Sequence, residues 1–258
     1  MAGFDLDGRV VWVTGSSRGI GRGVAEHLAS AGAQVVVHAR SAEALEEVVV
    51  ATGGLPVVAD VRDEDALRRA VEAVRERFGR LDGVVANVGG AAPAAAADVE
   101  LERFRRQLDL NLTAAFATVR AALPLLREAR GSAVLVSATG ARSATPGFAA
   151  YGAAKAAIEH LTGSLAAEWG PAVRVNCVCP GLIQTHGSLQ AVFRGDEALV
   201  ARAGKTTAVG RAGTPEDIAY ACQYLLSDAA SFVSGAVLVI DGGPTDGPAQ
   251  RILQAIRD

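Results

Sequence analysis

The clearest indication of the fold class is a glycine-rich stretch near the start of the chain, Thr14-Gly15-Ser16-Ser17-Arg18-Gly19-Ile20-Gly21. It follows an apolar run at 10–13 and opens a helix-permissive segment from about Ile20 to Ser30. Gly15 permits a tight turn, Gly19 lets the backbone approach a bound group closely, and Gly21 allows the helix to pack near the strand. The free N–H groups of a helix N-terminus favour a pyrophosphate at such a turn. The spacing is Gly-x-x-x-Gly-x-Gly and does not match the generic dinucleotide-binding pattern Gly-x-Gly-x-x-Gly. The prediction of a phosphate-binding turn therefore depends on the strand before it and the helix after it.

Strand-like and helix-like segments alternate along the whole chain. Seven apolar runs are strand candidates: Val10 to Val13, Gln34 to His38, Leu55 to Ala59, Gly83 to Ala86, Ala133 to Val136, Val173 to Val178 and Ala236 to Ile240. Continuously apolar strands separated by helices indicate a parallel sheet that is covered on both faces. We therefore predict an α/β fold, a Rossmann-type doubly wound parallel sheet of about seven strands with helices on both faces. No repeat or long linker interrupts the pattern, so residues 1–258 are expected to form a single domain.

Two helix starts carry clear capping signals. Thr214-Pro215-Glu216-Asp217 combines a capping threonine, a proline at the first helical position and an acid three residues after the cap. Asp63 is expected to cap a second helix that runs to Phe78 and stops at Gly79.

The composition excludes several classes of protein. Of the 258 residues, 50% are apolar, 21% are charged and 29 are glycine without a three-residue period, which excludes a disordered or collagen-like chain. A net charge of −3 leaves no electrostatic footprint for nucleic acid or an anionic membrane. The start of the chain carries two acids where a signal peptide has basic residues, and no run approaches the roughly 20 apolar residues of a membrane span.

Cysteine and histidine content points to the same kind of protein. Three cysteines, an odd number, argue against a disulfide framework, and Cys177 and Cys179 are expected to be small buried residues. The four histidines do not have the spacing of metal ligands, so no metal site is predicted. These observations predict a protein of the cytoplasm, with neither nucleic acid nor a membrane as partner.

The end of the second strand candidate bears on which dinucleotide is bound. Enzymes that use NAD tend to place an acid there, which holds the ribose 2′-OH. Here the sequence is His38-Ala39-Arg40-Ser41 and contains no acid. Arg40, together with Arg18 in the turn, could clamp a 2′-phosphate. The alternative is that both arginines are ordinary surface charges, but their positions favour NADPH/NADP+ over NADH.

Tyr151 and Lys155 are candidates for acid–base chemistry. They are four residues apart on a predicted helix and therefore share one face. A free tyrosine has a pKa of about 10, and a lysine ammonium one turn away is expected to lower it toward the working range. Taken alone, such a pair is commonly a solvated helix face. Ser137 changes this interpretation, because it ends a strand at the sheet edge where ligands bind and its hydroxyl is expected to point into that crevice.

Together these motifs resemble the short-chain dehydrogenase/reductase family, in its branch of roughly 250 residues with a single Rossmann-type domain. The resemblance covers about residues 6 to 243. The turn at 14–21 matches the family's Thr-Gly-x-x-x-Gly-x-Gly, and Asp60-Val61 matches the pair whose acid holds the adenine. Ala86-Asn87-Val88-Gly89 is similar to the family's Asn-Asn-Ala-Gly stretch, with two substitutions that narrow the space beside Asn87.

Further motifs follow in the family's order. Pro180-Gly181-Leu182-Ile183-Gln184-Thr185 is similar to the segment that holds the nicotinamide amide, and Asp241-Gly242-Gly243 is the usual ending after the last strand. The resemblance implies the catalytic set Asn111, Ser137, Tyr151 and Lys155. The implied cofactor-binding residues are Gly15, Ser17, Arg18, Gly19, Ile20, Gly21, Arg40, Asp60, Val61, Asn87, Gly89, Tyr151, Lys155, Pro180, Gly181, Ile183 and Thr185.

By resemblance, the expected reaction is the interconversion of a ketone and a secondary alcohol with NADP(H). Tyr151 would exchange the proton, and Ser137 would hydrogen-bond to the same substrate oxygen. Lys155 would lower the tyrosine pKa and hold the nicotinamide ribose, while Asn111 would anchor a water. A 3-oxoacyl thioester is one candidate substrate class. An epimerase or dehydratase of the extended branch is disfavoured by chain length and glycine spacing, and the intact catalytic set speaks against a non-catalytic NADP-binding sensor or scaffold.

The substrate-binding part carries the weakest signals. The segment at about 185–207 is expected to form a lid over the substrate, and its mostly small or apolar residues favour an apolar or ring-bearing carbonyl compound. Family members are mostly tetramers or dimers, so the resemblance implies a homo-oligomer, with a homotetramer as the leading expectation. The C-terminal tail at 244–258 either packs on a partner subunit or frays.

Overall fold

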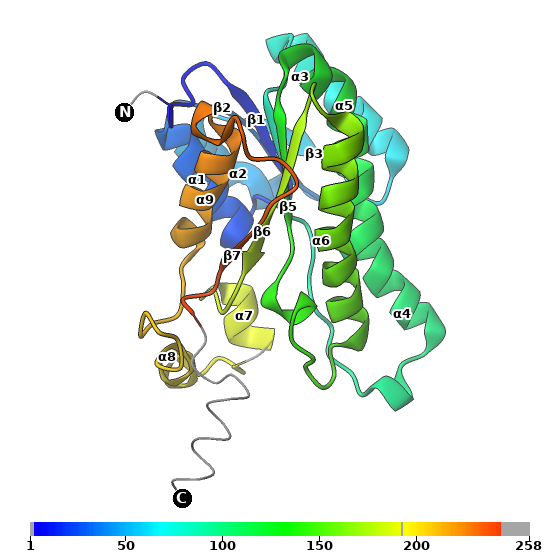
Figure 1. Ribbon diagram of the computed structural model, residues 1–258, viewed down its shortest axis with the longest axis vertical. Helices are drawn as coiled ribbons and strands as arrows, with labels where there is room; N and C mark the ends of the chain where they lie inside the picture. Colours follow the sequence, from blue (N-terminus) through cyan, green and yellow to red (C-terminus); the bar gives the residue numbers. More distant parts are fainter. Residues whose placement is uncertain (1–2, 192, 244–258) are drawn as a thin grey trace, which may run out of the picture.

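The centre of the molecule is a parallel sheet whose seven strands lie in the order β3-β2-β1-β4-β5-β6-β7 (Figure 1). The computed structural model describes residues 3–191 and 193–243. Its strands are β1 (Val10–Val13), β2 (Gln34–Ala39), β3 (Leu55–Val58), β4 (Gly83–Ala86), β5 (Ser132–Val136), β6 (Arg174–Pro180) and β7 (Val237–Ile240). The order runs outward in both directions from the β1–β4 pair, which makes the sheet doubly wound. The predicted fold class is confirmed, and strand boundaries differ from the predicted ones by at most two residues.

Helices cover both faces of the sheet, as predicted. Their bounds are α1 (Gly19–Ser30), α2 (Glu46–Thr52), α3 (Glu64–Phe78), α4 (Leu101–Leu108), α5 (Ala114–Ala129), α6 (Ala149–Trp169), α7 (His186–Ala191), α8 (Glu197–Gly204) and α9 (Pro215–Leu226). Figure 1 shows α1, α2 and α9 on one side of the sheet and α3, α5 and α6 on the other. Alternate residues of β1 point to opposite faces, so Trp12 joins the core under α3, α5 and α6, whereas Val11 joins the core under α1, α2 and α9.

Both helix starts that the sequence marks are formed. The Asp63 carboxylate accepts hydrogen bonds from the amides of Asp65 (2.9 Å) and Ala66 (3.0 Å) at the start of α3. That helix stops at Gly79, whose φ of +70° is the left-handed conformation that glycine adopts without strain. Thr214 and Asp217 form a capping box at the start of α9.

The connection from α4 to α5 is a feature that the sequence pattern did not predict. Residues Asp109–Thr113 form a π-helical turn, in which the Ala114 amide donates to the Asp109 carbonyl five residues back. Such turns interrupt the regular ladder and are frequent at functional sites. The turn carries Asn111, which is fully buried.

The segment at 185–207, predicted to be a lid, contains α7 and α8 in its described part. An isolated parallel bridge between Ile183 and Gly213 closes the base of this excursion. The predicted tail at 244–258 lies outside the described residues. Among the residues that are described, no helix is long and apolar enough to cross a membrane.

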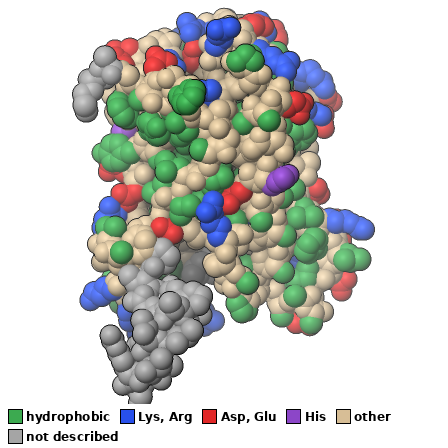
Figure 2. Space-filling model, viewed as in Figure 1, with side chains coloured by type: hydrophobic (Ala, Val, Ile, Leu, Met, Phe, Trp, Pro, Cys, Tyr) green, Lys and Arg blue, Asp and Glu red, His purple; other side chains and the backbone are tan. Residues whose placement is uncertain are grey.

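Charged side chains of both signs are intermixed on the face drawn in Figure 2, so this face carries no patch of one sign. The three cysteines are free and buried, which agrees with the prediction of Cys177 and Cys179 as small core residues. Within residues 3–191 and 193–243, no group of three or more potential metal ligands comes together.

Candidate active site

The turns after β1 and β4 are joined by side chains at the point where the sheet order reverses. The Thr14 amide donates to the Val85 carbonyl (3.0 Å), and the Asn87 amide donates to Thr14 Oγ1 (3.1 Å). Asn87 Nδ2 also donates to the Thr14 carbonyl (3.0 Å). Asn87 therefore fixes the glycine-rich turn to the neighbouring strand end, at the crevice where open α/β sheets bind ligands.

The glycine-rich turn has the shape that a pyrophosphate requires. Gly15 and Gly19 have φ values of +66° and +58°, in the left-handed region. A Cβ on Gly21 would lie 2.3 Å from the Gly15 carbonyl oxygen and 2.5 Å from Asn87 Nδ2, so a larger residue cannot occupy this position without a shift of the turn. Among the described residues no side chain caps α1, and its first turn has no acid. The free amides and positive potential of this helix start fit a dinucleotide phosphate.

His38 supports this turn from the end of β2, a role that the sequence analysis missed. The Gly15 amide donates to His38 Nδ1 (3.2 Å), and the His38 amide donates to Ser16 Oγ (2.7 Å). The imidazole is 1% exposed, and burial lowers its pKa to about 4. Because Nδ1 accepts a hydrogen bond, the ring is neutral with its proton on Nε2, which has no partner in the described part of the chain. A neutral, buried histidine thus orients the Gly15 amide.

The two arginines predicted to clamp a 2′-phosphate are both exposed. In residues 3–191 and 193–243, Arg18 and Arg40 have neither an ion pair nor a side-chain hydrogen bond, so their donors are available for a ligand. Asp60, predicted to hold the adenine, is paired with Arg62, whose Nε lies 3.0 Å from its Oδ1. The hydrogen bond from Arg62 is the main cause that lowers the pKa of Asp60 to about 2, and the charge of Arg40 makes a smaller contribution to the same shift. The adjacent Val61 is 3% exposed.

The segment predicted to hold the nicotinamide lies against the glycine-rich turn. A Cβ on Gly19 would be 3.5 Å from Thr185 Cγ2, which places Thr185 beside the glycine-rich turn. Gly181 packs against Asp241, where an added Cβ would lie 2.5 Å from Asp241 Cβ. Ile183 is 6% exposed, and Pro180 ends β6. Two residues distant in sequence, 19 and 185, therefore lie side by side.

Asn111, Gly89 and Lys155 meet at one point. A Cβ on Gly89 would lie 2.7 Å from Asn111 Oδ1 and 3.1 Å from Lys155 Nζ, so glycine is needed for this approach. The Asn111 side chain accepts a hydrogen bond from the Gly90 amide (2.9 Å) and donates to the Gly90 carbonyl (3.0 Å). It also donates to the Gln107 carbonyl (3.0 Å), which ties α4 to this point. Asn111 thus holds the loop after β4 in place.

The predicted effect of Lys155 on the Tyr151 pKa is wrong for this arrangement of the chain. Burial raises the pKa of Tyr151 to about 12 and lowers that of Lys155 to about 8. Lys155 Nζ donates to the Val136 carbonyl (2.8 Å) and lies 5.7 Å from the centre of the tyrosine ring. The lysine therefore stands beside the ring and not at its hydroxyl, and desolvation outweighs its charge.

Ser137 is also oriented differently from the prediction. It is 2% exposed, and its Oγ lies 3.0 Å from Glu159 Oε1 and 3.2 Å from the Lys155 carbonyl, so the hydroxyl faces α6. Arg142 Nε holds the same Glu159 oxygen (3.1 Å). Glu159 was missed, although it continues the spacing of 151 and 155 by one further turn of the same helix face.

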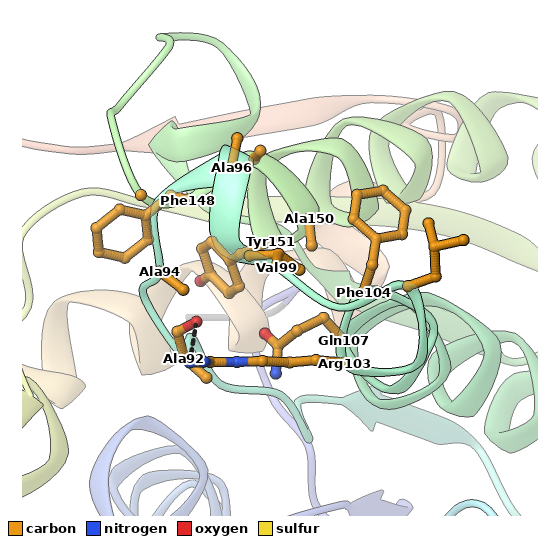
Figure 3. A pocket seen from close by; sticks show the side chains of 13 residues that line it. Ala92, Ala94, Ala96, Val99, Arg103, Phe104, Gln107, Phe148, Ala150 and Tyr151 are labelled. Carbon is orange, nitrogen blue, oxygen red and sulfur yellow. Dashed lines mark hydrogen bonds between the residues drawn. The ribbon is translucent and has the colours of Figure 1, made fainter.

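A small apolar cavity opens beside Tyr151 (Figure 3). It lies between α4, the loop that precedes it and the start of α6, and its volume is about 170 Å³. Alanines and two phenylalanines, Phe104 and Phe148, form most of its wall. Phe148 meets the Tyr151 ring edge to face, with centroids 6.2 Å apart. Tyr151 therefore lies between Lys155 and this apolar cavity.

Known proteins of this architecture resemble the chain over almost its whole length. Residues 15–245 match the family model described as enoyl-(acyl carrier protein) reductase. The 2,5-dichloro-2,5-cyclohexadiene-1,4-diol dehydrogenase of Sphingobium indicum is 36% identical, over 93% of this chain and 98% of that protein.

Two solved structures agree with this relationship. One is a short-chain type dehydrogenase/reductase from Mycobacterium marinum, with a TM-score of 0.86, 34% identity and coverage of 95% of this chain and 98% of that one. The other, from Beutenbergia cavernae, is assigned as an NAD(P)-dependent gluconate 5-dehydrogenase with NADP bound at low occupancy (TM-score 0.83, 36% identity, 93% and 97% coverage). With its doubly wound sheet, its glycine-rich turn and these relatives, the chain belongs to the short-chain dehydrogenase/reductase family of nicotinamide-dependent oxidoreductases.

Proposed function

We propose that the chain interconverts a ketone and a secondary alcohol with NADP(H), with Tyr151 as the proton donor and acceptor. One observation carries this proposal: Tyr151, Lys155 and Asn111 converge at the crevice that the glycine-rich turn also borders. When bound, the nicotinamide supplies the hydride, and the protein supplies position and protons.

The proton chemistry follows from the state of the side chains. With a pKa of about 12, Tyr151 is protonated at neutral pH and can donate to a substrate oxygen on which negative charge grows. Lys155, whose Nζ lies 5.7 Å from the centre of the tyrosine ring, would hold the nicotinamide ribose. Ser137 would turn its hydroxyl from Glu159 toward the same substrate oxygen, and Asn111 holds the loop that carries Gly89.

Tyr151→Phe tests the reaction class. Loss of a general acid typically costs about 10²–10⁴-fold in rate, so turnover of a panel of ketones should fall by that factor. The Kd for NADPH, measured by fluorescence titration, should remain within about twofold of the wild-type value. The backbone amides of the glycine-rich turn, and not the phenol of Tyr151, are proposed to bind the cofactor phosphates. If wild type binds NADPH but reduces no ketone, the protein is instead a non-catalytic NADP-binding sensor or scaffold.

The preference for NADP(H) is part of the proposal and rests on Arg18 and Arg40. Their unpaired guanidinium groups suit a 2′-phosphate, and no acid ends β2. Arg40→Glu should weaken NADPH binding by at least about tenfold and leave NADH binding equal or tighter, since charge-assisted contacts are the strong ones. Arg69→Glu, at an exposed arginine of α3, controls for the change of charge. Equal kcat/KM with NADH and NADPH in wild type would refute the clamp.

A 3-oxoacyl thioester reductase is the second candidate, because a 3-oxoacyl-(acyl carrier protein) reductase of Thermotoga maritima is 33% identical over 92% of this chain and 98% of that protein. The cavity beside Tyr151 has about 170 Å³, below the roughly 300 Å³ at which pockets for drug-sized ligands begin. This volume favours a short or single-ring substrate over a long acyl chain. Activity with acetoacetyl thioesters that exceeds activity with small ketones would reverse the order of the two candidates.

A further inference from the structure

We propose that Gln107 is a specificity-determining residue that hydrogen-bonds to a second hydroxyl group of the substrate, so that the preferred substrates are compact diols and hydroxyketones. This inference rests on the proposed function, because it places the reacting oxygen of the substrate at Tyr151. The observation that carries it is an amide in the wall of the cavity with nothing in the protein to bind.

Three polar side chains line the cavity, and two of them have other tasks. Tyr151 is the proposed proton donor. The Arg103 guanidinium donates to the carbonyl of Pro93 (3.2 Å) and, at 3.4 Å, to that of Ala92, so it fixes the loop that forms one wall. Figure 3 shows this arginine along the bottom of the view, with its hydrogen bond drawn to that loop. Gln107 is the third polar residue.

The Gln107 amide is left without a partner. Its Oε1 is buried and unpaired, and no hydrogen bond within residues 3–191 and 193–243 involves its side chain. Buried polar atoms in native proteins are usually paired, and each exception needs a reason. In Figure 3 the Gln107 amide and the Tyr151 ring face the same space. Because no hydrogen bond among the described residues holds this side chain, the amide can turn toward a ligand that enters this space, and the ligand can supply the missing hydrogen bond.

The position of Gln107 is fixed relative to the catalytic centre. It lies on α4, one turn before Asn111, and its own carbonyl accepts the hydrogen bond from Asn111 Nδ2 (3.0 Å). Because Asn111 is in turn bound to Gly90, which follows the Gly89 that lies beside Lys155, the Gln107 backbone cannot shift without disturbing the catalytic centre. The base of the unpaired side chain is therefore held at a defined place with respect to Tyr151.

The chemistry of the wall selects the class of ligand. An amide presents one acceptor and two donors, and a hydroxyl group can satisfy either kind of site. The rest of the lining is alanine, valine, leucine, glycine and phenylalanine, which suits a neutral carbon skeleton. A volume of about 170 Å³ limits that skeleton to a single ring or a short chain. A compact substrate with one oxygen at Tyr151 and another hydroxyl at Gln107 meets all three conditions.

The test compares cyclohexanol with cyclohexane-1,2-diol, cyclohexane-1,3-diol and cyclohexane-1,4-diol as substrates for oxidation with NADP+. Wild type should oxidise at least one diol with a kcat/KM at least about tenfold above that of cyclohexanol, because sites built to hydrogen-bond a hydroxyl reject analogues that lack it. Gln107→Met, with an unbranched side chain of similar length, should remove this preference. Its kcat/KM for the diol should fall to that for cyclohexanol, which should stay within about twofold of the wild-type value. Arg106→Met, at the exposed neighbouring position on α4, is the matched control.

Two further readouts separate specificity from a structural role. Loss of an unpaired buried amide should raise the Tm of Gln107→Met or leave it unchanged, whereas a structural role would lower it. Calorimetric titration of the four alcohols in the presence of NADP+ should show the same loss of preference as the kinetics. A Gln107→Met variant with the wild-type ratio in both measurements overturns the inference and leaves the reaction class intact. Absence of turnover with every alcohol refutes the proposed function, and the titrations then decide on Gln107 alone.

Discussion

The neutral state of His38 predicts a specific sensitivity of the fold to acid. Burial lowers the pKa of this imidazole from 6.5 to about 4, while the unfolded chain keeps the ordinary value. Between these two pH values the unfolded state binds a proton that the folded state does not bind. The free energy of unfolding therefore falls as the pH falls through this window, and the stabilising contribution is complete above about pH 6.5.

The size of the effect follows from the width of the window. Each unit of pKa difference corresponds to 1.36 kcal/mol, so a difference of about 2.5 units gives a loss of about 3 kcal/mol by pH 4. A domain with about 5–15 kcal/mol of stability loses a substantial part of it. Protonation also converts Nδ1 from an acceptor into a donor, so the hydrogen bond from the Gly15 amide is lost and the cofactor turn loosens.

His38→Asn removes the titrating group and isolates its contribution. Urea unfolding of both proteins, followed by tryptophan fluorescence, gives the free energy of unfolding at pH values from about 7 to about 4. Trp12 lies edge to face with His38, with centroids 6.1 Å apart, and reports on this region. As the pH falls from about 7 to about 4, the free energy of unfolding of wild type should decrease by about 3 kcal/mol more than that of the variant. Carboxylates elsewhere in the protein affect both proteins equally. His160→Asn, at an exposed position of α6, is the control for loss of a histidine. Parallel curves for wild type and His38→Asn would refute the reasoning.

Three further predictions concern the cradle, the core and the catalytic serine. Gly21→Ala places a methyl group 2.3 Å from the Gly15 carbonyl oxygen, so the Kd for NADPH measured by fluorescence should rise at least about tenfold. An unchanged Kd would show that the glycine-rich turn does not bind the cofactor. Asp82→Asn weakens a 5%-exposed acceptor that binds a backbone amide of β1 and an arginine, and should lower the free energy of unfolding in urea by about 2 kcal/mol. Glu159→Gln weakens the hydrogen bond that holds the Ser137 hydroxyl away from the substrate oxygen, and a loss of about 1 kcal/mol predicts a kcat about fivefold higher with NADPH binding unchanged. A kcat equal to that of wild type would show that the glutamate does not hold the serine back.

Most of the fold could be predicted because its signals are local. Buried parallel strands are continuously apolar, and each helix start at 63 and 214 carries its own capping residues within three positions. The glycine-rich turn is equally local, since the need for glycine at 15, 19 and 21 arises from the turn itself. The π-helical turn at 109–113 has no such signal, because one wider turn changes neither composition nor hydrophobic period.

The site was harder to predict, because its energetics depend on what surrounds each side chain. The spacing of Tyr151 and Lys155 correctly indicated that both lie on one helix face. The upward shift of the Tyr151 pKa is caused by burial, and the spacing carries no information about burial. His38 lies two residues before Arg40 and carries no signal of its own in the sequence, and its contact with Gly15 becomes visible only when β2 is placed beside β1.

The same four-residue spacing that indicated the catalytic pair also carries the two positions that were missed. Glu159 follows Lys155 by four residues on α6, and Gln107 precedes Asn111 by four residues near the end of α4. A polar residue one turn from a catalytic residue usually faces solvent on an amphipathic helix, so the spacing alone gives no reason to select it. What distinguishes these two is that α4 and α6 both border the cavity beside Tyr151. Glu159 lies two turns beyond Tyr151 on α6, is held by Arg142 and receives the Ser137 hydroxyl, whereas Gln107 lines the cavity and has no side-chain partner in the part of the chain that the structure describes. This difference has a physical interpretation: the paired carboxylate binds another side chain of the protein, and the unpaired amide is the group that we propose to bind the substrate.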